Sequence, residues 1–545
     1  MPSYRFVPRG AKVLLAAAWL ALAAPVSAQS VEELIRTRVE ELAATGVLDA
    51  AGASIAARNL IPKLYAERSF KPAWKSAQQV ESLFEVVNDS YLEGLDPDDY
   101  HSDSVRAALV AFKSVDTLSP AQRADYDIML TDSVFRLGYH LRFGKLEPEA
   151  LDPDWNLNRE FTSEDPAKTI QDAIDSRSMR EFAAKMIPRH PIYDGFKRAL
   201  AEYRAIAANG GWPTVPAGPT LKPGMTDARV PTLVQRLAAT HDLDPAAVDA
   251  AATRYDGEVV AGMRRFQDRH GLTPDGAIGP ATLAALNVPV GARVDQIRAN
   301  LERARWVLYD PRSEFIVVNI AGFQAYAIRN GEVAWRSRVV VGKPYTRTPV
   351  FSANMTYAVV NPTWTVPLNI ARNETLPALR RNPGYLASHN MDAYAGGKLV
   401  DPATVNWAAA TASQYRFVQR PGPDNALGFI KFMFPNGHDI YLHDTPSRSL
   451  FEKDARAFSH GCIRVADVHG LAELLLGWNR AKLDAAIATG RTQTVLLDKP
   501  LLVMLLYWTV QADDQGRVIF FPDIYDRDPP VIAALAAPYK PSPRL

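Results

Sequence analysis

The sequence predicts a multidomain α+β protein: a helical N-terminal region, a small three-helix module, and a mostly antiparallel β domain with a long insertion. Three observations support this fold class. The chain has 545 residues, which suits three or four domains at roughly 150 residues each. Apolar residues recur at helical spacing through residue 208, and the pattern changes to strand-like alternation from residue 314. A Gly- and Pro-rich stretch between these regions, residues 209–229, is expected to be a linker.

Composition excludes several classes of protein. Lys plus Arg number 61 and Asp plus Glu number 60, so bulk charge does not favour nucleic-acid binding. Apolar residues make up 47% and charged residues 22%, which excludes a chain that is disordered throughout. The single cysteine, Cys462, excludes an intramolecular disulfide and a cysteine-rich zinc module. Its thiol is therefore either an inert buried group or a reactive one.

Residues 1–28 have the features of a cleaved export signal. Arg5, Arg9 and Lys12 precede an apolar run, residues 13–24, and Ser27-Ala28 offers a small-residue cleavage site. The alternative is a membrane anchor, but the run of about 12 residues is short against the ~20 that a spanning helix needs. We therefore expect an exported protein without a permanent membrane anchor.

The rest of the chain divides by pattern. Residues 29–208 are expected to form a helical scaffold without a catalytic constellation, and residues 230–289 a three-helix module. A connector (290–313) leads to a β domain (314–498) that contains the insertion 362–425, and C-terminal strands and a tail follow (499–545).

Turn signals define elements of the β domain. Asn330-Gly331 and Asn436-Gly437 each predict a hairpin. A helix is expected over residues 466–476, and a final strand pair is expected to join residues 501–510 to residues 517–521.

The strongest chemical signal combines His443 with Ser459-His460-Gly461-Cys462. Thiol catalysis needs a thiolate, a base that reaches it, and donors facing the oxyanion. Cys462 can supply the thiolate. Either His443 or His460 can supply the base, since spacing alone does not choose between them. Backbone amides near Gly461 and Cys462 can supply the third. The helix expected near residue 466 would lower the pKa of the thiol.

Alternatives to thiol catalysis remain open at this point. Asp444 adjoins His443, but neighbours on a strand point to opposite faces, so a backbone carbonyl is at least as good a candidate for orienting the ring. Cys462 could instead be a buried structural residue. His438, His443, His460 and Cys462 could ligate zinc, but no carboxylate pattern supports an activated water, so we expect neither a metal nor another cofactor.

Two stretches resemble known wall-enzyme modules. Part of residues 230–289 resembles a small peptidoglycan-binding module through a string that comprises Phe266, Gln267, His270, Gly271, Leu272, Asp275, Gly276, Ile278, Gly279, Thr282, Leu283, Leu286 and Asn287. His443 with Ser459-His460-Gly461-Cys462 matches the active-site signature of the L,D-transpeptidases, whose catalytic domain is the YkuD type. Residues 428–444, the segment 65–100 and the tail 507–525 look like large multidomain members from the Gram-negative periplasm.

This resemblance implies roles for individual residues. Cys462 would be the nucleophile and His443 the base, with Ser459, His460 and Gly461 shaping the oxyanion site. Arg464 stands where many members have Asn. Its guanidinium could hold a substrate carboxylate or pair with an acid such as Asp467.

The resemblance also implies a reaction. Cys462 would take the acyl group from the third residue of a tetrapeptide peptidoglycan stem and pass it to the side-chain amine of a second stem, making a 3→3 cross-link. The insertion 362–425 would cap the substrate. Peptidoglycan stems and other wall-synthesis enzymes are the expected partners, in the periplasm. The alternatives are hydrolysis or lipoprotein attachment by the same acyl-enzyme, or a catalytically silent wall-binding scaffold.

Overall fold

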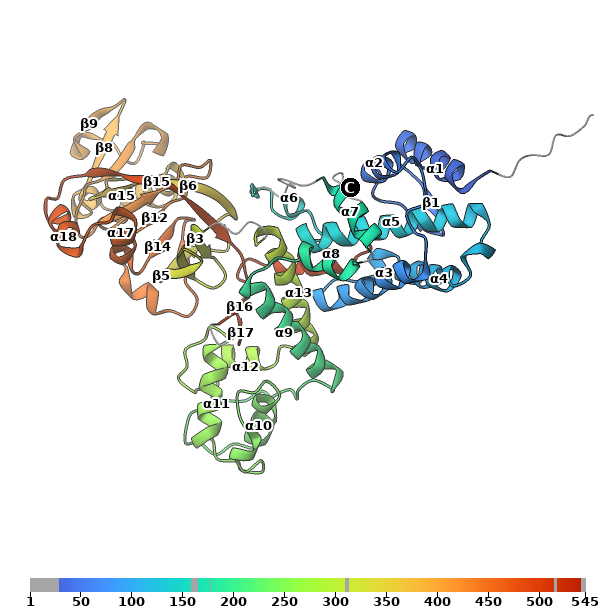
Figure 1. The fold of residues 1–545 in the computed structure, drawn as a ribbon. Helices are drawn as coiled ribbons and strands as arrows, with labels where there is room; N and C mark the ends of the chain where they lie inside the picture. The colour runs from blue at the N-terminus through green and yellow to red at the C-terminus, as the bar shows by residue number, and fades with distance from the viewer. Residues whose placement is uncertain (1–28, 158–164, 177, 309–312, 514–516, 541–545) are drawn as a thin grey trace, which may run out of the picture.

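A computed structural model of the protein describes residues 29–157, 165–176, 178–308, 313–513 and 517–540. The described chain forms a helical lobe, a small helical module and a β-rich lobe that meet at a central group of helices (Figure 1). The export signal expected for residues 1–28 lies outside the described residues. Within the described ranges, the helices are all too short or too polar to cross a membrane.

The helical lobe is built around one long, nearly buried helix, α5 (Pro120–Phe143). Its start follows from sequence, since Ser119 and Gln122 form a capping box and Pro120 occupies the first turn. The helices that pack around it in one apolar core are α1 (Val31–Thr45), α2 (Leu60–Glu67), α3 (Ala77–Asp89), α4 (Ser102–Phe112), α7 (Pro166–Ser176) and α8 (Met179–Met186). A short hairpin, β1 (Asp49–Ala50) and β2 (Ala53–Ser54), and helix α6 (Pro148–Leu151) complete the lobe.

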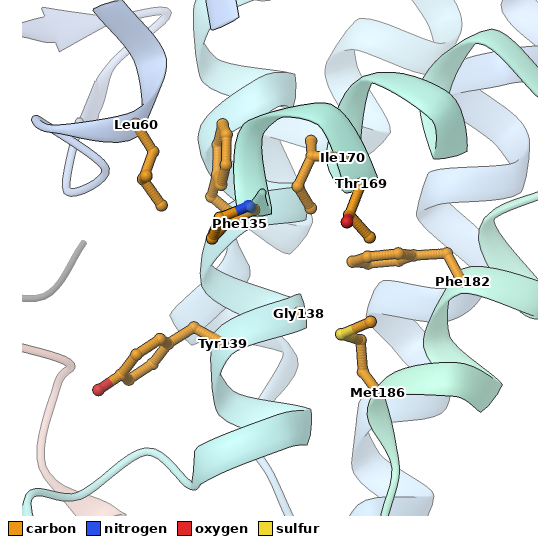
Figure 2. A pocket seen from close by; sticks show the side chains of 9 residues that line it. Leu60, Phe135, Gly138, Tyr139, Thr169, Ile170, Phe182 and Met186 are labelled. Atoms are coloured by element: carbon orange, nitrogen blue, oxygen red, sulfur yellow. The ribbon is translucent and has the colours of Figure 1, made fainter. Parts of the chain in front are cut away.

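Figure 2 shows a small cavity in this core, lined by apolar side chains such as Leu60, Phe135, Phe182 and Met186. Its volume of about 20 Å³ is close to the space that one water needs, and an apolar lining offers water no partners. The cavity is therefore a packing gap and not a ligand site.

Two helices join the lobes. Helix α9 (Pro191–Ala208) packs along α13 (Val290–Val307), and both contact a small hairpin formed by β16 (Val510–Ala512) and β17 (Val518–Phe520). The final helix, α19 (Asp528–Ala536), also packs on α13. Beyond it the tail returns to the helical lobe, where Lys145 donates to the carbonyls of Leu535 and Ala537.

The small module contains the three predicted helices, α10 (Val230–Ala238), α11 (Gly257–Asp268) and α12 (Pro280–Leu286). Its core includes apolar residues from each helix. The Pro-rich segment that precedes it is packed and not free, because Val215 and Leu221 are buried in the same core and Leu221 bridges to Ile278.

The β-rich lobe is a nine-stranded, mostly antiparallel sheet in the described chain, as predicted. The strand order is β13-β5-β14-β12-β11-β6-β15-β3-β4, and a further β4–β5 pairing closes one part of it. Three pairs are parallel: β12–β14, β13–β5 and β15–β3. The strands are β3 (Glu314–Asn319), β4 (Gln324–Arg329), β5 (Glu332–Gly342), β6 (Phe351–Val360), β11 (Ile430–Met433), β12 (Leu442–His443), β13 (Ala457–Ser459), β14 (Ile463–Val465) and β15 (Gln493–Leu506).

Both predicted hairpins form, but their connections differ in length. Asn330 and Gly331 both have positive φ, 53° and 81°, and join β4 to β5 as predicted. The hairpin predicted at Asn436-Gly437 also forms, between β11 and β12, but its connection is a loop over residues 434–441 and not a two-residue turn. The Asn436 side chain spans this loop, donating to the carbonyls of Phe434 and Ile440 and accepting from two backbone amides.

Two other local predictions need correction. The predicted helix at residue 466 begins later, as α17 (Val468–Leu476), because β14 continues through Val465 and Asp467 caps the helix. Helix α18 (Arg480–Ala488) follows. Residues 501–506 do not pair with residues 517–521. They belong to β15, which is held between β6 and β3, and only β16 pairs with β17.

The insertion 362–425 folds around its own apolar core, which includes Trp407 and Phe417. Its sheet has the order β7 (Trp364–Thr365), β10 (Arg416–Gln419), β8 (Met391–Ala395), β9 (Lys398–Val400). A π-helical turn, η5 (Ala371–Thr375), lies between α14 (Leu368–Ile370) and α15 (Leu376–Arg381), and α16 (Tyr385–Ser388) follows.

Candidate active site

The site lies where β11, β12 and β14 run side by side. His443 of β12 pairs with Lys431 of β11 and with Arg464 of β14. Laterally paired residues project to the same face of a sheet, so these three side chains form one row. The alternate residues, which face the apolar core and are fully buried, are Leu442, Ile463 and Phe432.

Cys462 and Tyr441 lie on the same face as this row. The Ile463 amide donates to the Tyr441 carbonyl at 3.1 Å, which extends the β12–β14 pairing by one residue. Each of the two side chains is two residues from a member of the row, so alternation brings it to the same face. The sheet therefore brings Cys462 and His443 together as diagonal neighbours, about 7–8 Å apart at the backbone.

The thiol of Cys462 is half-buried, and its sulfur contacts the carbonyl oxygen of Asp439 at 3.6 Å. Burial raises the pKa of the thiol, while hydrogen bonds from Tyr441 and the charge of Arg464 lower it. The predicted lowering by a helix N-terminus was wrong, because β14 separates Cys462 from α17. The Cys462 thiol is thus neutral at pH 7.

His443 is buried and oriented by a backbone carbonyl. Its Nδ1 lies 2.5 Å from the carbonyl oxygen of Asp444, and a carbonyl only accepts, so Nδ1 bears the proton. Nε2 is then the nitrogen that can accept one. Burial lowers the pKa of His443 to about 3, with further lowering by Arg464 and Lys431, so the ring is neutral at pH 7.

The Asp444 carboxylate points away from the His443 ring, as strand alternation predicts. It accepts from the Phe429 amide at 3.0 Å and from Arg448 at 3.1 Å. Asp444 therefore orients His443 through its main chain alone.

Buried side chains hold the turn before Cys462. Ser459 Oγ donates to the Cys462 carbonyl at 2.6 Å and accepts from the Gly461 amide at 3.1 Å. Thr348 Oγ1 donates to the Gly461 carbonyl at 2.7 Å. Gly461 has φ +119°, which strongly favours glycine. Because the Gly461 amide is engaged, the remaining candidate donor for an oxyanion is the Cys462 amide, which has no hydrogen-bond acceptor among the described residues.

His460 faces the insertion. Its Nε2 lies 2.7 Å from Glu374 Oε1 in η5. Of the two candidate bases, His443 shares the sheet face of Cys462, whereas His460 is bound to Glu374. His438 packs on Phe351, and within the described ranges no three His, Cys, Asp or Glu side chains cluster as metal ligands.

Arg464 does not pair with Asp467. The Asp467 carboxylate accepts from Trp335 Nε1 at 2.9 Å and from the Gly470 amide at 3.0 Å, capping α17. Arg464 Nε is buried without a hydrogen-bond partner, and the guanidinium has no carboxylate partner among the described residues.

Sequence reasoning missed several residues at this site. Tyr441 and Lys431 carried a usable signal, since Lys431 lies in β11 and Tyr441 directly precedes β12, each at a position that shares the face of His443. Thr348 and Glu374 come from a distant loop and from the insertion, and only the tertiary structure brings them here.

Comparison with known proteins identifies the domains. A scaffold domain family matches residues 59–200, the "Putative peptidoglycan binding domain" family matches residues 226–286, and the L,D-transpeptidase catalytic domain (YkuD) matches residues 313–495. A curated "Putative L,D-transpeptidase" of Haemophilus influenzae is 36% identical over 218 residues, which cover 39% of this chain and 44% of that protein. The chain thus spans less than half the length of this relative. The crystal structure of an L,D-transpeptidase (residues 123–326) from Xylanimonas cellulosilytica aligns at 16% identity over 53% of this chain and 99% of that chain, but with a TM-score of 0.17.

The β-rich lobe is therefore an L,D-transpeptidase catalytic domain of the YkuD type. The chain combines this domain with matches to a scaffold domain and a peptidoglycan-binding domain, in the order predicted from sequence.

Proposed function

We propose that this protein is an L,D-transpeptidase that forms 3→3 cross-links in peptidoglycan through a thioester on Cys462. The observation that carries the proposal is the placement of Cys462 and His443 on one face of the parallel pair β12–β14. The matched catalytic and peptidoglycan-binding domains support it.

In the first half-reaction, His443 Nε2 accepts the thiol proton as Sγ attacks the carbonyl carbon of the third residue in a tetrapeptide donor stem. The tetrahedral intermediate collapses with cleavage of its C–N bond. The imidazolium returns the proton to the departing amine of D-alanine, and a thioester remains on Cys462.

In the second half-reaction, the side-chain amine of the third residue on an acceptor stem attacks the thioester. His443 accepts the amine proton, the C–S bond breaks, and the sulfur is reprotonated. The new amide bond is the 3→3 cross-link. Water in place of the amine would hydrolyse the thioester, and a protein amine would attach a lipoprotein.

The electrostatics of the site set the starting state for these roles, since the thiol and the imidazole are both uncharged before the substrate binds. A pKa of about 3 keeps His443 neutral and able to accept a proton at pH 7. The Cys462 amide can donate to the oxyanion, and Arg464, which has no described carboxylate partner, can hold a carboxylate of the donor.

The insertion 362–425 is proposed to cap the bound stem. Its contact with the catalytic turn is the Glu374–His460 pair. Glu374→Gln should weaken this contact and raise KM for cross-linking, whereas Glu473→Gln, a half-buried control in α17, should not. Deleting residues 375–420 should abolish cross-linking while the sheet remains folded, and full activity after deletion would contradict the capping role.

The decisive experiment is intact-mass measurement with a carbapenem, whose β-lactam ring acylates a nucleophile held as proposed. We expect one adduct on the wild type, none on Cys462→Ala, and strongly slowed formation on His443→Gln. Absence of the wild-type adduct would favour a catalytically silent scaffold.

Incubation with tetrapeptide muropeptides then separates the acceptors. Dimers lacking one D-alanine indicate cross-linking, and tripeptides alone indicate hydrolysis. Such substrates place the protein outside the cytoplasm, as the export signal expected for residues 1–28 does.

A further inference from the structure

Lys431 lies in the row of the site, but the proposed reaction does not use it. It pairs with His443 on the side opposite Arg464, so the buried imidazole lies between two cations. The Lys431 ammonium lies 5.5 Å from the centroid of the Tyr441 ring, and the side chain is half-buried. No carboxylate of the described residues lies within ion-pair distance of it.

A half-buried cation without a carboxylate partner is costly, because desolvation is not offset by an ion pair. Burial lowers the pKa values of Lys431 and Arg464 accordingly. Two such cations on one face indicate an anionic ligand between or beside them. Arg464 lies two residues from Cys462 and is already proposed to hold one carboxylate of the donor. Lys431 is the second cation without a carboxylate partner among the described residues, so we expect it to bind a second anionic group of the substrate.

The position of Lys431 sets where that group must be. Lys431 lies two strands from Cys462 and is offset from it by two residues along the strands, which gives a backbone distance of about 12 Å at 4.7–4.9 Å per strand and ~3.3 Å per residue. Its ammonium leans over Tyr441, whose side chain hydrogen-bonds to Cys462, so the charge lies closer to the sulfur than its backbone does.

A donor peptide that ends one residue after the attacked carbonyl fits the distance between the Cys462 sulfur and the Lys431 ammonium. Sulfur approaches the carbonyl carbon at about 3–3.5 Å. The terminal carboxylate lies three bonds further, about 4 Å at normal bond lengths, and an ammonium binds a carboxylate at about 2.8 Å. A longer peptide would place its carboxylate beyond Lys431.

We infer that Lys431 binds the terminal carboxylate of the residue that leaves, and so selects donors that end one residue after the attacked carbonyl. Lys431 is then a specificity-determining residue of the site. This inference rests on the proposed function.

The test compares a tetrapeptide donor with the same peptide carrying a C-terminal amide. For the wild type, kcat/KM for release of the leaving residue should be about 10- to 100-fold higher for the acid, as expected for a charge-assisted hydrogen bond. Lys431→Met should lose this preference, with KM for the acid rising toward KM for the amide. Lys431→Arg should retain most of it. Lys482→Met is the matched control, since Lys482 also lies over an aromatic ring, Trp478, at 4.5 Å but on α18.

Equal wild-type rates for the acid and the amide would overturn the inference without any variant, and so would a Lys431→Met enzyme that keeps the wild-type ratio. Either result can occur in an enzyme that still forms the Cys462 thioester. Failure of the Lys431 inference can therefore be distinguished from failure of the proposed function. A wild type that forms no thioester with either donor would overturn both proposals.

Discussion

Alkylation of Cys462 by iodoacetamide should report a neutral thiol. Burial raises the pKa of this thiol above its ordinary value of 9.0, and an ordinary thiol of that value is about 1% ionised at pH 7. Because only the thiolate reacts, the rate constant at pH 7 should be below about 1% of its limit at high pH. It should rise about tenfold per pH unit between pH 6 and pH 8.

A preformed thiolate–imidazolium pair would behave differently. Its alkylation rate would stay nearly constant from pH 5 to pH 8, since the thiolate would already be present. The structure disfavours that pair, because burial together with the cations Arg464 and Lys431 lowers the pKa of His443 to about 3. In the proposed mechanism, His443 therefore takes the thiol proton only as the sulfur attacks the substrate.

The Arg464→Gln variant extends the test. The Arg464 charge lowers the pKa of the Cys462 thiol, while Asp439 raises it, so removing the guanidinium should move the inflection to higher pH. Arg336→Gln, an exposed position on β5, is the control and should leave the profile unchanged. A wild-type rate that is independent of pH between 5 and 8 would refute the reasoning.

Other expected outcomes concern the turn, the helix cap and the buried histidines. Ser459→Ala removes two buried hydrogen bonds and should lower the free energy of unfolding by about 1–3 kcal/mol and slow carbapenem acylation; an unchanged melting temperature with full acylation would contradict this. Asp467→Ala removes the cap of α17 and should cost about 1 kcal/mol in thermal denaturation, yet leave the alkylation profile of Cys462 unchanged, since Asp467 does not pair with Arg464. The pKa values of His140, His270 and His443 are all lowered by burial, so below about pH 6.5 the unfolded chain binds protons that the folded chain does not. Stability should fall on acidification by up to about 1.4 kcal/mol per pH unit for each histidine, down to about pH 3 for His443; urea midpoints that rise from pH 7 to pH 4 would contradict this.

Local features were predictable from the sequence because their causes are local. Helical periodicity identified the three helices of the small module, and strand alternation predicted the mostly antiparallel sheet. Asn330-Gly331 encodes its own turn through two positive φ values. The loop at Asn436 was not predictable in the same way, because its width depends on side-chain hydrogen bonds to residues four positions apart. The partners of β15 lie more than a hundred residues away in sequence, so a local pattern could not specify them.

For the site, the sequence alone determined which reactive residue types are available: one cysteine, two nearby histidines and a flexible glycine. The preference for His443 over His460 came from the family resemblance, because sequence spacing does not show which side chains share a face of the sheet with Cys462. Only the tertiary structure decided that question physically, through the register of β12 against β14. The tertiary structure also decided the protonation states of Cys462 and His443. Burial and the two cations beside His443 arise from strand neighbours, so no motif could have shown that thiol and imidazole both rest uncharged.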